Sequence, residues 1–266
     1  MKLDAPDIAQ YFPHLQERVM PHSLGQPVLS DWADMPDDHE LKLYKNCGFL
    51  NRDEAAILYQ CAKQFPHGDW LDIGAHTGWT ALHVAAAGLH VSALEPMYAD
   101  DAFFDRANAN INERAKFGDQ VFMMPVTSRM HFEKLESDQE YDGVMIDGDH
   151  CWMNPLYDAV KAFKHLATNS VVVLHDFIGG PVREATRYLM CEGMKCRVYC
   201  ASSQLLAVCW RGDFTPPDYT PDPKIDWRSV LEPLAATRLV DFQDGHAITD
   251  PQHTQGSGDF YFELCS

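Results

Sequence analysis

Between residues 70 and 192 the chain alternates five apolar, strand-like stretches with five helix-like stretches. This alternation predicts successive β-α-β units, which require a mainly parallel sheet with helices on both faces. Two further strand-like stretches follow, at 195–201 and 205–211, and the short polar turn between them predicts an antiparallel pair at the sheet edge. The sequence therefore predicts an α/β fold with seven strands. The expected parallel strands are residues 70–74, 90–95, 120–125, 141–147 and 169–175, and the expected helices are residues 78–88, 100–116, 131–136, 152–167 and 180–192.

The two ends of the chain lack this alternation. Residues 1–65 predict an N-terminal arm and a helical cap. The first forty residues are rich in Pro, Asp and His without a sustained period, which predicts an irregular arm with one short helix. Asn51 and Glu54 have the spacing of a capping box before an apolar stripe, which predicts a helix to about Gln64. Residues 66–211 form the expected core domain. Six prolines follow Gly212, so residues 212–266 predict an acidic, proline-rich extension with only brief strand candidates such as 260–264.

Charge and cysteine usage narrow the class of partner. The chain carries 21 Lys and Arg against 39 Asp and Glu, a net charge of −18, which repels phosphate backbones and anionic membranes. We therefore expect neither a nucleic-acid nor a membrane partner, and no apolar run approaches the ~20 residues that span a bilayer. Eight cysteines without a C-x-x-C pair or a secretory leader predict reduced thiols in a cytoplasmic protein. The sequence leaves open whether the chain forms a homo-oligomer.

The turn after the first predicted strand carries two glycines. In an open parallel sheet, ligands bind beyond the carboxyl ends of the strands, which is where this turn lies. Gly74 would let the backbone approach a ligand closely, and Gly78 would open a helix whose free N–H groups face the same crevice. The pair thus predicts a nucleoside-type cofactor. The alternative is that the two glycines only make a tight strand-to-helix turn.

A carboxylate at the end of the second predicted strand supports the nucleoside interpretation. Glu95 follows the glycine turn by about twenty residues, and a carboxylate there can accept hydrogen bonds from both ribose hydroxyls. His76 occupies the middle glycine position of the G-x-G-x-x-G pattern of dinucleotide-binding proteins. This departure disfavours an NAD(P)-dependent oxidoreductase, which remains the alternative enzyme class.

The fourth and fifth predicted strands both end in ionisable residues. Asp147 and His150 follow the fourth strand, and His175 and Asp176 end the fifth. Adjacent parallel strands would bring Asp147 and Asp176 together, and neighbouring carboxylates repel unless a proton or a divalent cation lies between them. A Mg²⁺-like site is one hypothesis, and His175 as a ligand would suit Mn²⁺, Fe²⁺ or Zn²⁺ better. The alternative is that Asp147 only orients a cofactor and Asp176 caps a turn.

Residues 72–82, DIGAHTGWTAL, resemble the first motif of class I S-adenosylmethionine-dependent methyltransferases, in the form found in caffeoyl-CoA and catechol O-methyltransferase relatives. The resemblance covers residues 48–211 and implies a Rossmann-like sheet and S-adenosylmethionine as cofactor. The candidate cofactor-binding positions, taken from the residues and the resemblance together, lie at the ends of the first four strands, where the hydroxyls of Thr127 and Ser128 could reach an adenine edge. They are Asp72, Gly74, Ala75, His76, Gly78, Trp79, Glu95, Pro96, Met97, Thr127, Ser128, Asp147 and Gly148.

The same resemblance implies metal and catalytic roles. Cation-dependent relatives place metal-binding Asp residues at the positions of Asp147 and Asp176, but Phe177 stands where they usually have an Asn ligand, so His175 is the candidate third ligand. His150 is the candidate base, because an ordinary His pKa of ~6.5 suits proton removal near neutral pH, and Asp147 would orient the acceptor. The predicted activity is methyl transfer to a hydroxyl oxygen of a small molecule, with Mg²⁺ or another divalent cation as a possible aid. A cofactor-binding protein without catalysis is the alternative from another class.

Overall fold

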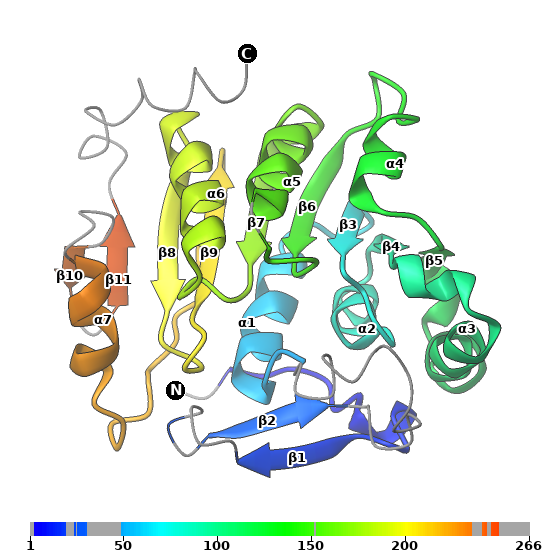
Figure 1. Ribbon diagram of the computed structural model, residues 1–266, viewed down its shortest axis with the longest axis horizontal. Helices are drawn as coiled ribbons and strands as arrows, with labels where there is room; N and C mark the ends of the chain where they lie inside the picture. Colours follow the sequence, from blue (N-terminus) through cyan, green and yellow to red (C-terminus); the bar gives the residue numbers. More distant parts are fainter. Residues whose placement is uncertain are drawn as a thin grey trace.

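The computed structural model describes residues 3–19, 24, 26–30, 49–151, 153–235, 241–243 and 246–249 of the 266-residue chain. Its centre is a parallel sheet whose strands run in one direction with their carboxyl ends at one edge (Figure 1). The strand candidate at 260–264 lies outside the described residues. The parallel strands are β3 (Asp69–Ile73), β4 (His90–Leu94), β5 (Val121–Met124), β6 (Tyr141–Ile146) and β7 (Leu166–Leu174).

The predicted antiparallel pair is present as β8 (Lys195–Tyr199) and β9 (Leu206–Arg211), with β9 pairing against β7. These seven strands confirm the predicted α/β fold. Two short strands of the C-terminal region, β10 (Asp241–Gln243) and β11 (His246–Thr249), extend the sheet beyond β8. The full order is β10-β11-β8-β9-β7-β6-β3-β4-β5. The two added strands were not predicted from the sequence, because they are short and β11 pairs with β8, far away in the chain.

The helices follow the predicted order with shifted boundaries. Thr127 caps α4, its hydroxyl accepting from the N–H of Met130 at 3.2 Å, so this helix starts earlier than the predicted residue 131. β7 begins at Leu166, so the helix predicted for 152–167 ends sooner. The helices are α1 (Arg52–Ala62), α2 (Trp79–Ala86), α3 (Asp101–Asn108) continued by the π-helical turn η4 (Ala109–Arg114), α4 (Ser128–Phe132), α5 (Asn154–Phe163), α6 (Gly180–Cys191) and α7 (Trp227–Ala235), with short 3-10 turns η1 (Ala9–Tyr11), η3 (Pro96–Ala99) and η5 (Gly118–Gln120).

Apolar cores cover both faces of the sheet. In β7, Val171 and Val173 belong to the core shared with α1 and α2, whereas Val172 and Leu174 belong to the core shared with α5 and α6. Since side chains alternate between the faces of a strand, a strand buried on both sides needs an unbroken apolar run. The continuous apolar stretches of the sequence therefore become the central strands.

The N-terminal arm lies across the carboxyl-end edge of the sheet (Figure 1). It contains a two-stranded antiparallel sheet, β1 (Gln16–Val19) with β2 (Pro27–Ser30), where the sequence analysis expected irregular structure. Phe12 and Leu29 of the arm are buried in the same core as Trp79. The arm thereby closes one side of the region where parallel-sheet proteins bind ligands. Among the described residues, no helix has the length and apolarity needed to cross a membrane.

Candidate functional site

A cavity of about 1070 Å³ opens at the carboxyl ends of the parallel strands. β3 pairs with β4 on one side and with β6 on the other, so the cavity lies where the strand order reverses. Gln26, Pro27 and Phe49 of the N-terminal arm line it as well. Its volume is at the upper end of the range for small-molecule sites, up to ~1000 Å³. A nucleoside cofactor and a small acceptor therefore fit together.

The two glycines of the first turn are required by the packing of the chain itself. Gly74 has φ +88°, and a Cβ there would lie 2.3 Å from the main-chain oxygen of Asp147. Gly78 begins α2 with φ +98°, and a Cβ there would lie 2.5 Å from Cγ1 of Ile111. Positive φ is strained for any residue with a Cβ. Gly74 lets the turn pass against the main chain that follows β6, and Gly78 lets it pass against Ile111 of η4. Gly74 also lines the cavity.

Glu95 presents a carboxylate to the cavity from the end of β4. Its Oε2 accepts a hydrogen bond from the N–H of His76 at 3.1 Å, and its Oε1 accepts one from the N–H of Met97 at 3.0 Å. Burial raises the pKa of Glu95, and the two backbone hydrogen bonds oppose that rise. A carboxylate offers about four acceptor positions. Two positions thus stay available for the hydroxyls of a ligand.

Asp72 lies behind the turn and does not line the cavity. It is fully buried at the end of β3, where the hydroxyl of Thr80 donates to its Oδ2 at 2.5 Å. Burial raises the pKa of Asp72 to about 7, with smaller contributions from the charges of Asp147 and Glu95. Asp72 therefore supports the turn and the start of α2 from below.

Aromatic rings form one wall of the cavity. The ring of His76 lies 5.2 Å from that of Phe49 and 5.2 Å from that of Phe103. Trp79 stacks on Phe49 with their ring planes 10° apart. Burial lowers the pKa of His76 to about 3, so its ring is neutral. His76 and Trp79 of the motif therefore contribute aromatic surface to the wall of the cavity.

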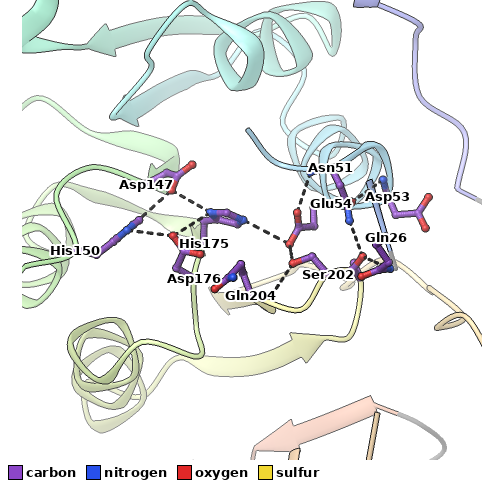
Figure 2. Close-up of polar contacts among 11 residues, drawn as sticks. Gln26, Asn51, Asp53, Glu54, Asp147, His150, His175, Asp176, Ser202 and Gln204 are labelled. Carbon is purple, nitrogen blue, oxygen red and sulfur yellow. Dashed lines mark hydrogen bonds and ion pairs between the residues drawn. The ribbon is translucent and has the colours of Figure 1, made fainter. Parts of the chain in front are cut away.

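The carboxyl ends of β6 and β7 carry a compact cluster of two carboxylates and two imidazoles (Figure 2). Nδ1 of His175 lies 3.1 Å from Oδ1 of Asp147 and 3.4 Å from Oδ2 of Asp176. Nδ1 of His150 lies 3.1 Å from Oδ2 of Asp176, and its Nε2 lies 3.4 Å from Oδ1 of Asp147. Asp176 has φ +56°, a left-handed conformation that Asp tolerates better than most residues. This turn directs its carboxylate back toward Asp147.

Charge within the cluster shifts its pKa values in opposite directions. Burial alone would lower the pKa of His175, but the carboxylates of Asp176, Asp147 and Glu54 hold it well above its usual value. Burial also opposes charge on His150, and Asp147 and Asp176 raise its pKa above the ordinary value. Burial raises the pKa of Asp147, and the two histidines more than offset this, lowering it to about 2. The cluster therefore attracts positive charge.

The donor atoms of this cluster fit a divalent cation. One ligand atom each of Asp147, His175 and Asp176 lies within 4.8 Å of the others. Neighbouring ligands of an octahedral ion with bonds of ~2.1 Å lie ~3 Å apart, close to the 3.1 and 3.4 Å observed here. Phe177 is buried in the core and supplies no ligand. The imidazole of His175 would offer a nitrogen ligand beside the two carboxylates, and such a donor set suits Mn²⁺, Fe²⁺ or Zn²⁺ better than Mg²⁺.

The structure brings together most of the residues singled out in the sequence. Asp72 and Gly78 lie outside the lining of the cavity. Pro96 and Met97 begin the turn after Glu95, while Thr127 and Ser128 begin α4 on the same side. The predicted residues that line the cavity are Gly74, Ala75, His76, Trp79, Glu95, Pro96, Met97, Thr127, Ser128, Asp147, Gly148, His150, His175 and Asp176.

Several polar residues of the cavity were not predicted from the sequence. Asp158 of α5 is buried beside Ser128, and burial raises its pKa to about 6. Glu54 and Ser202 reach the cavity from α1 and from the loop between β8 and β9. A buried carboxyl with a raised pKa is a functional signal, but it becomes visible only in three dimensions. For Glu54, the sequence indicated a capping residue and nothing more.

Comparison with known proteins finds a family that matches part of the chain and solved structures with the same fold. Residues 71–177 match the family described as a methyltransferase domain. No curated protein matches the chain. An O-methyltransferase from Bacillus cereus in complex with SAH superposes with a TM-score of 0.52 at 16% identity, covering 61% of this chain and 83% of that one. A putative caffeoyl-CoA O-methyltransferase from Staphylococcus aureus gives 0.50 at 18% identity, covering 62% and 85%.

The same fold also serves another acceptor chemistry. A precorrin-6y C5,15-methyltransferase from Geobacter metallireducens superposes with a TM-score of 0.51 at 15% identity, covering 61% of this chain and 91% of that one. At these identities the likeness shows the fold, and the acceptor has to be argued from the site. The oxidoreductase alternative has no support among these matches. Residues 71–177 therefore match a methyltransferase domain, and the order of the strands and the cavity at their ends give the chain the fold of the class I S-adenosylmethionine-dependent methyltransferases.

Proposed function

We propose that this methyltransferase transfers the methyl group of S-adenosylmethionine to a hydroxyl oxygen of a small molecule, assisted by a divalent cation. One observation carries the proposal: Glu95 and the cluster of Asp147, His150, His175 and Asp176 line the same cavity. A carboxylate at a strand end suits the two hydroxyls of a ribose. A cluster of carboxylates and imidazoles suits activation of a hydroxyl. The O-methyltransferases with the same fold support this assignment.

Different parts of the cavity wall bind different parts of the cofactor. Glu95 accepts hydrogen bonds from the ribose, and Gly74 and His76 lie beside the methionine part. Thr127 and Ser128 lie at the start of α4, on the side of the adenine. Asp72 and Gly78 support the turn from behind without contact with the cofactor. Positioning accounts for most of the rate of such a transfer, because the protein supplies no covalent step.

Asp147, His175 and Asp176 would hold the divalent cation. When bound, it polarises the hydroxyl of the acceptor and lowers the pKa of that hydroxyl. The carboxylates that raise the pKa of His175 also favour a cation beside its Nδ1. Asp147 thereby orients the acceptor as well as the cation.

His150 removes the proton from the acceptor hydroxyl. Its Nδ1 lies at hydrogen-bond distance from Asp176, so Nδ1–H donates to that carboxylate, and Nε2, which lies 3.4 Å from Oδ1 of Asp147, takes the proton beside that second carboxylate. The imidazolium that forms lies between the carboxylates of Asp147 and Asp176, which stabilise its charge. The orienting carboxylate and the base therefore have distinct roles.

Calorimetric titration with S-adenosylhomocysteine, S-adenosylmethionine and NADH tests the cofactor. We expect the two adenosyl ligands to bind and NADH to give no heat of binding. Turnover is then measured across a panel of small hydroxylated acceptors and matched amines, with EDTA or with Mn²⁺ or Mg²⁺. Loss of turnover in EDTA, restored by the cation, supports the proposal. Adenosyl binding without turnover on any acceptor would favour a cofactor-binding protein without catalysis, and tighter binding of NADH would refute the assignment.

A further inference from the structure

The carboxylate of Glu54 extends from α1 toward the proposed cation cluster of Asp147, His175 and Asp176 (Figure 2). Glu54 is 1% exposed, and its Oε2 accepts a hydrogen bond from the N–H of Asn51 at 2.9 Å, as a capping box requires. Its Oε1 has a different environment: it accepts a hydrogen bond from the hydroxyl of Ser202 and lies 3.5 Å from Nε2 of His175. Capping explains one oxygen of this carboxylate. The other belongs to the site.

Because Glu54 is buried, the contacts of its Oε1 with Ser202 and His175 matter for its energy. A carboxylate removed from water is costly unless hydrogen bonds or an opposite charge compensate it. A capping glutamate on a helix surface would have water for this purpose, whereas Glu54 has Ser202 and His175. The buried carboxylate and the imidazole therefore depend on each other.

The ring of His175 lies between the carboxylate of Glu54 and the carboxylates of Asp147 and Asp176. Its Nε2 faces Glu54, and its Nδ1 faces Asp147 and Asp176. A histidine that binds a metal through one nitrogen typically donates its other N–H to a carboxylate, which fixes the tautomer and the ring orientation. Glu54 supplies such a carboxylate, because it faces Nε2 of His175 while Asp147 and Asp176 face Nδ1.

We propose that Glu54 is a positioning residue that acts through His175, holding its Nε2–H so that the Nδ1 lone pair points at the cation bound with Asp147 and Asp176. Ser202 and Asn51 fix Glu54 in turn. The inference rests on the proposed cation site and adds a residue outside the matched segment 71–177. It also predicts that Glu54 favours cations that accept nitrogen ligands over Mg²⁺.

The test measures cation binding by titration calorimetry, with the visible spectrum of bound Co²⁺ as a second readout. Glu54→Gln keeps the capping box, since Gln also serves at this helix position, but removes the anionic acceptor. We expect Mn²⁺ to bind about 10- to 100-fold more weakly, with a changed Co²⁺ spectrum and unchanged affinity for S-adenosylhomocysteine. Asp53→Asn is the matched control. It removes the same negative charge one residue away, but Asp53 accepts its hydrogen bond from Tyr219, outside the cluster.

Two further variants separate position from charge. Glu54→Asp keeps the charge but withdraws the carboxylate from His175 by ~1.5 Å, one carbon–carbon bond. A positioning role predicts weaker Mn²⁺ binding here too, whereas a purely electrostatic role predicts wild-type affinity and overturns the proposal. In a His175→Ala background, Glu54→Gln should have no further effect, because the residue through which it acts is gone.

The outcomes distinguish this inference from the proposed function. If the wild-type protein binds no Mn²⁺, Zn²⁺ or Co²⁺, the cation part of the proposed function fails and this inference fails with it. If the wild type binds the cation and both Glu54→Gln and Ser202→Ala keep its affinity and spectrum, only the role of Glu54 is refuted. Ser202→Ala removes a hydrogen bond to Glu54 without altering α1, so it tests the proposal even if Glu54→Gln does not fold.

Discussion

Nδ1 of His150 lies 3.1 Å from Oδ2 of Asp176, across the ends of two adjacent strands. This contact assigns the roles of the two ring nitrogens in the proposed mechanism: Nδ1–H donates to Asp176, and Nε2, 3.4 Å from Oδ1 of Asp147, is the nitrogen that takes the proton. Asp176 thus has two functions: it orients the proposed base and contributes an oxygen to the cation cluster.

Replacement of His150 by Ala is expected to lower kcat by about 10²- to 10⁴-fold, the usual contribution of a general base. The affinity for S-adenosylhomocysteine should not change, because the ribose and adenine contacts lie elsewhere in the cavity. Steady-state kinetics and calorimetry measure the two quantities. His90→Ala is the control, since the side chain of His90 is 60% exposed at the start of β4. Full turnover in His150→Ala would remove this residue from the mechanism.

Replacement of Glu95 by Ala is expected to weaken the binding of S-adenosylhomocysteine by about 10- to 100-fold, because two hydrogen bonds to a charged acceptor are lost. The affinity of Glu95→Gln for S-adenosylhomocysteine should lie between those of Glu95→Ala and the wild type, since Gln keeps one oxygen acceptor. Calorimetry gives the dissociation constants, and Glu113→Ala, which removes an exposed carboxylate outside the cavity lining, is the control. Wild-type affinity in Glu95→Ala would contradict the ribose assignment.

Alanine substitutions at two glycines with positive φ distinguish how much backbone strain and how much a steric clash lower the free energy of unfolding. Gly88 has φ +96° with nothing within 4 Å of an added Cβ, whereas Gly74 has φ +88° and would meet the main chain of Asp147. Gly88→Ala should lower the free energy of unfolding by about 1 kcal/mol, the cost of the strained conformation alone. Gly74→Ala should cost clearly more and also weaken cofactor binding. Equal losses in urea denaturation would show that the turn yields without displacing Asp147.

The raised pKa of Asp72 predicts a pH dependence of stability. Its value of about 7 in the folded protein exceeds the ordinary value of 3.8, so the folded state holds this proton where the unfolded state has lost it. Its contribution is therefore complete below pH ~4 and is lost as the pH rises toward 7, by roughly 1 kcal/mol per pH unit. Asp72→Asn carries no titrating group here.

Urea denaturation of wild type and Asp72→Asn between pH 4 and 8 measures this effect. The wild type should lose stability relative to Asp72→Asn as the pH rises through this window. A difference between the two proteins that stays constant from pH 4 to pH 8 would show that Asp72 is ionised in the folded state throughout.

Much of the cavity follows from local patterns in the sequence. Apolar runs predicted where the strands lie along the chain, and the strand ends carry Gly74, Glu95, Asp147 and His175. Because the carboxyl ends of parallel strands meet at one edge, residues scattered along the chain were predicted to share one site. The boundaries were less predictable: α4 starts at Ser128 because of the hydroxyl of the residue before it.

The sequence by itself determined the sheet and the set of residues at its edge, since strand periodicity and turn residues act over a few positions. Tertiary structure alone decided that Glu54 contacts Ser202, 148 residues away, and lies beside His175. It also decided that β1 and β2 form where irregular structure was expected, and that β11 extends the sheet beyond β8. Such contacts depend on how α1 and the N-terminal arm pack against the finished sheet, and no local pattern of residues encodes that packing.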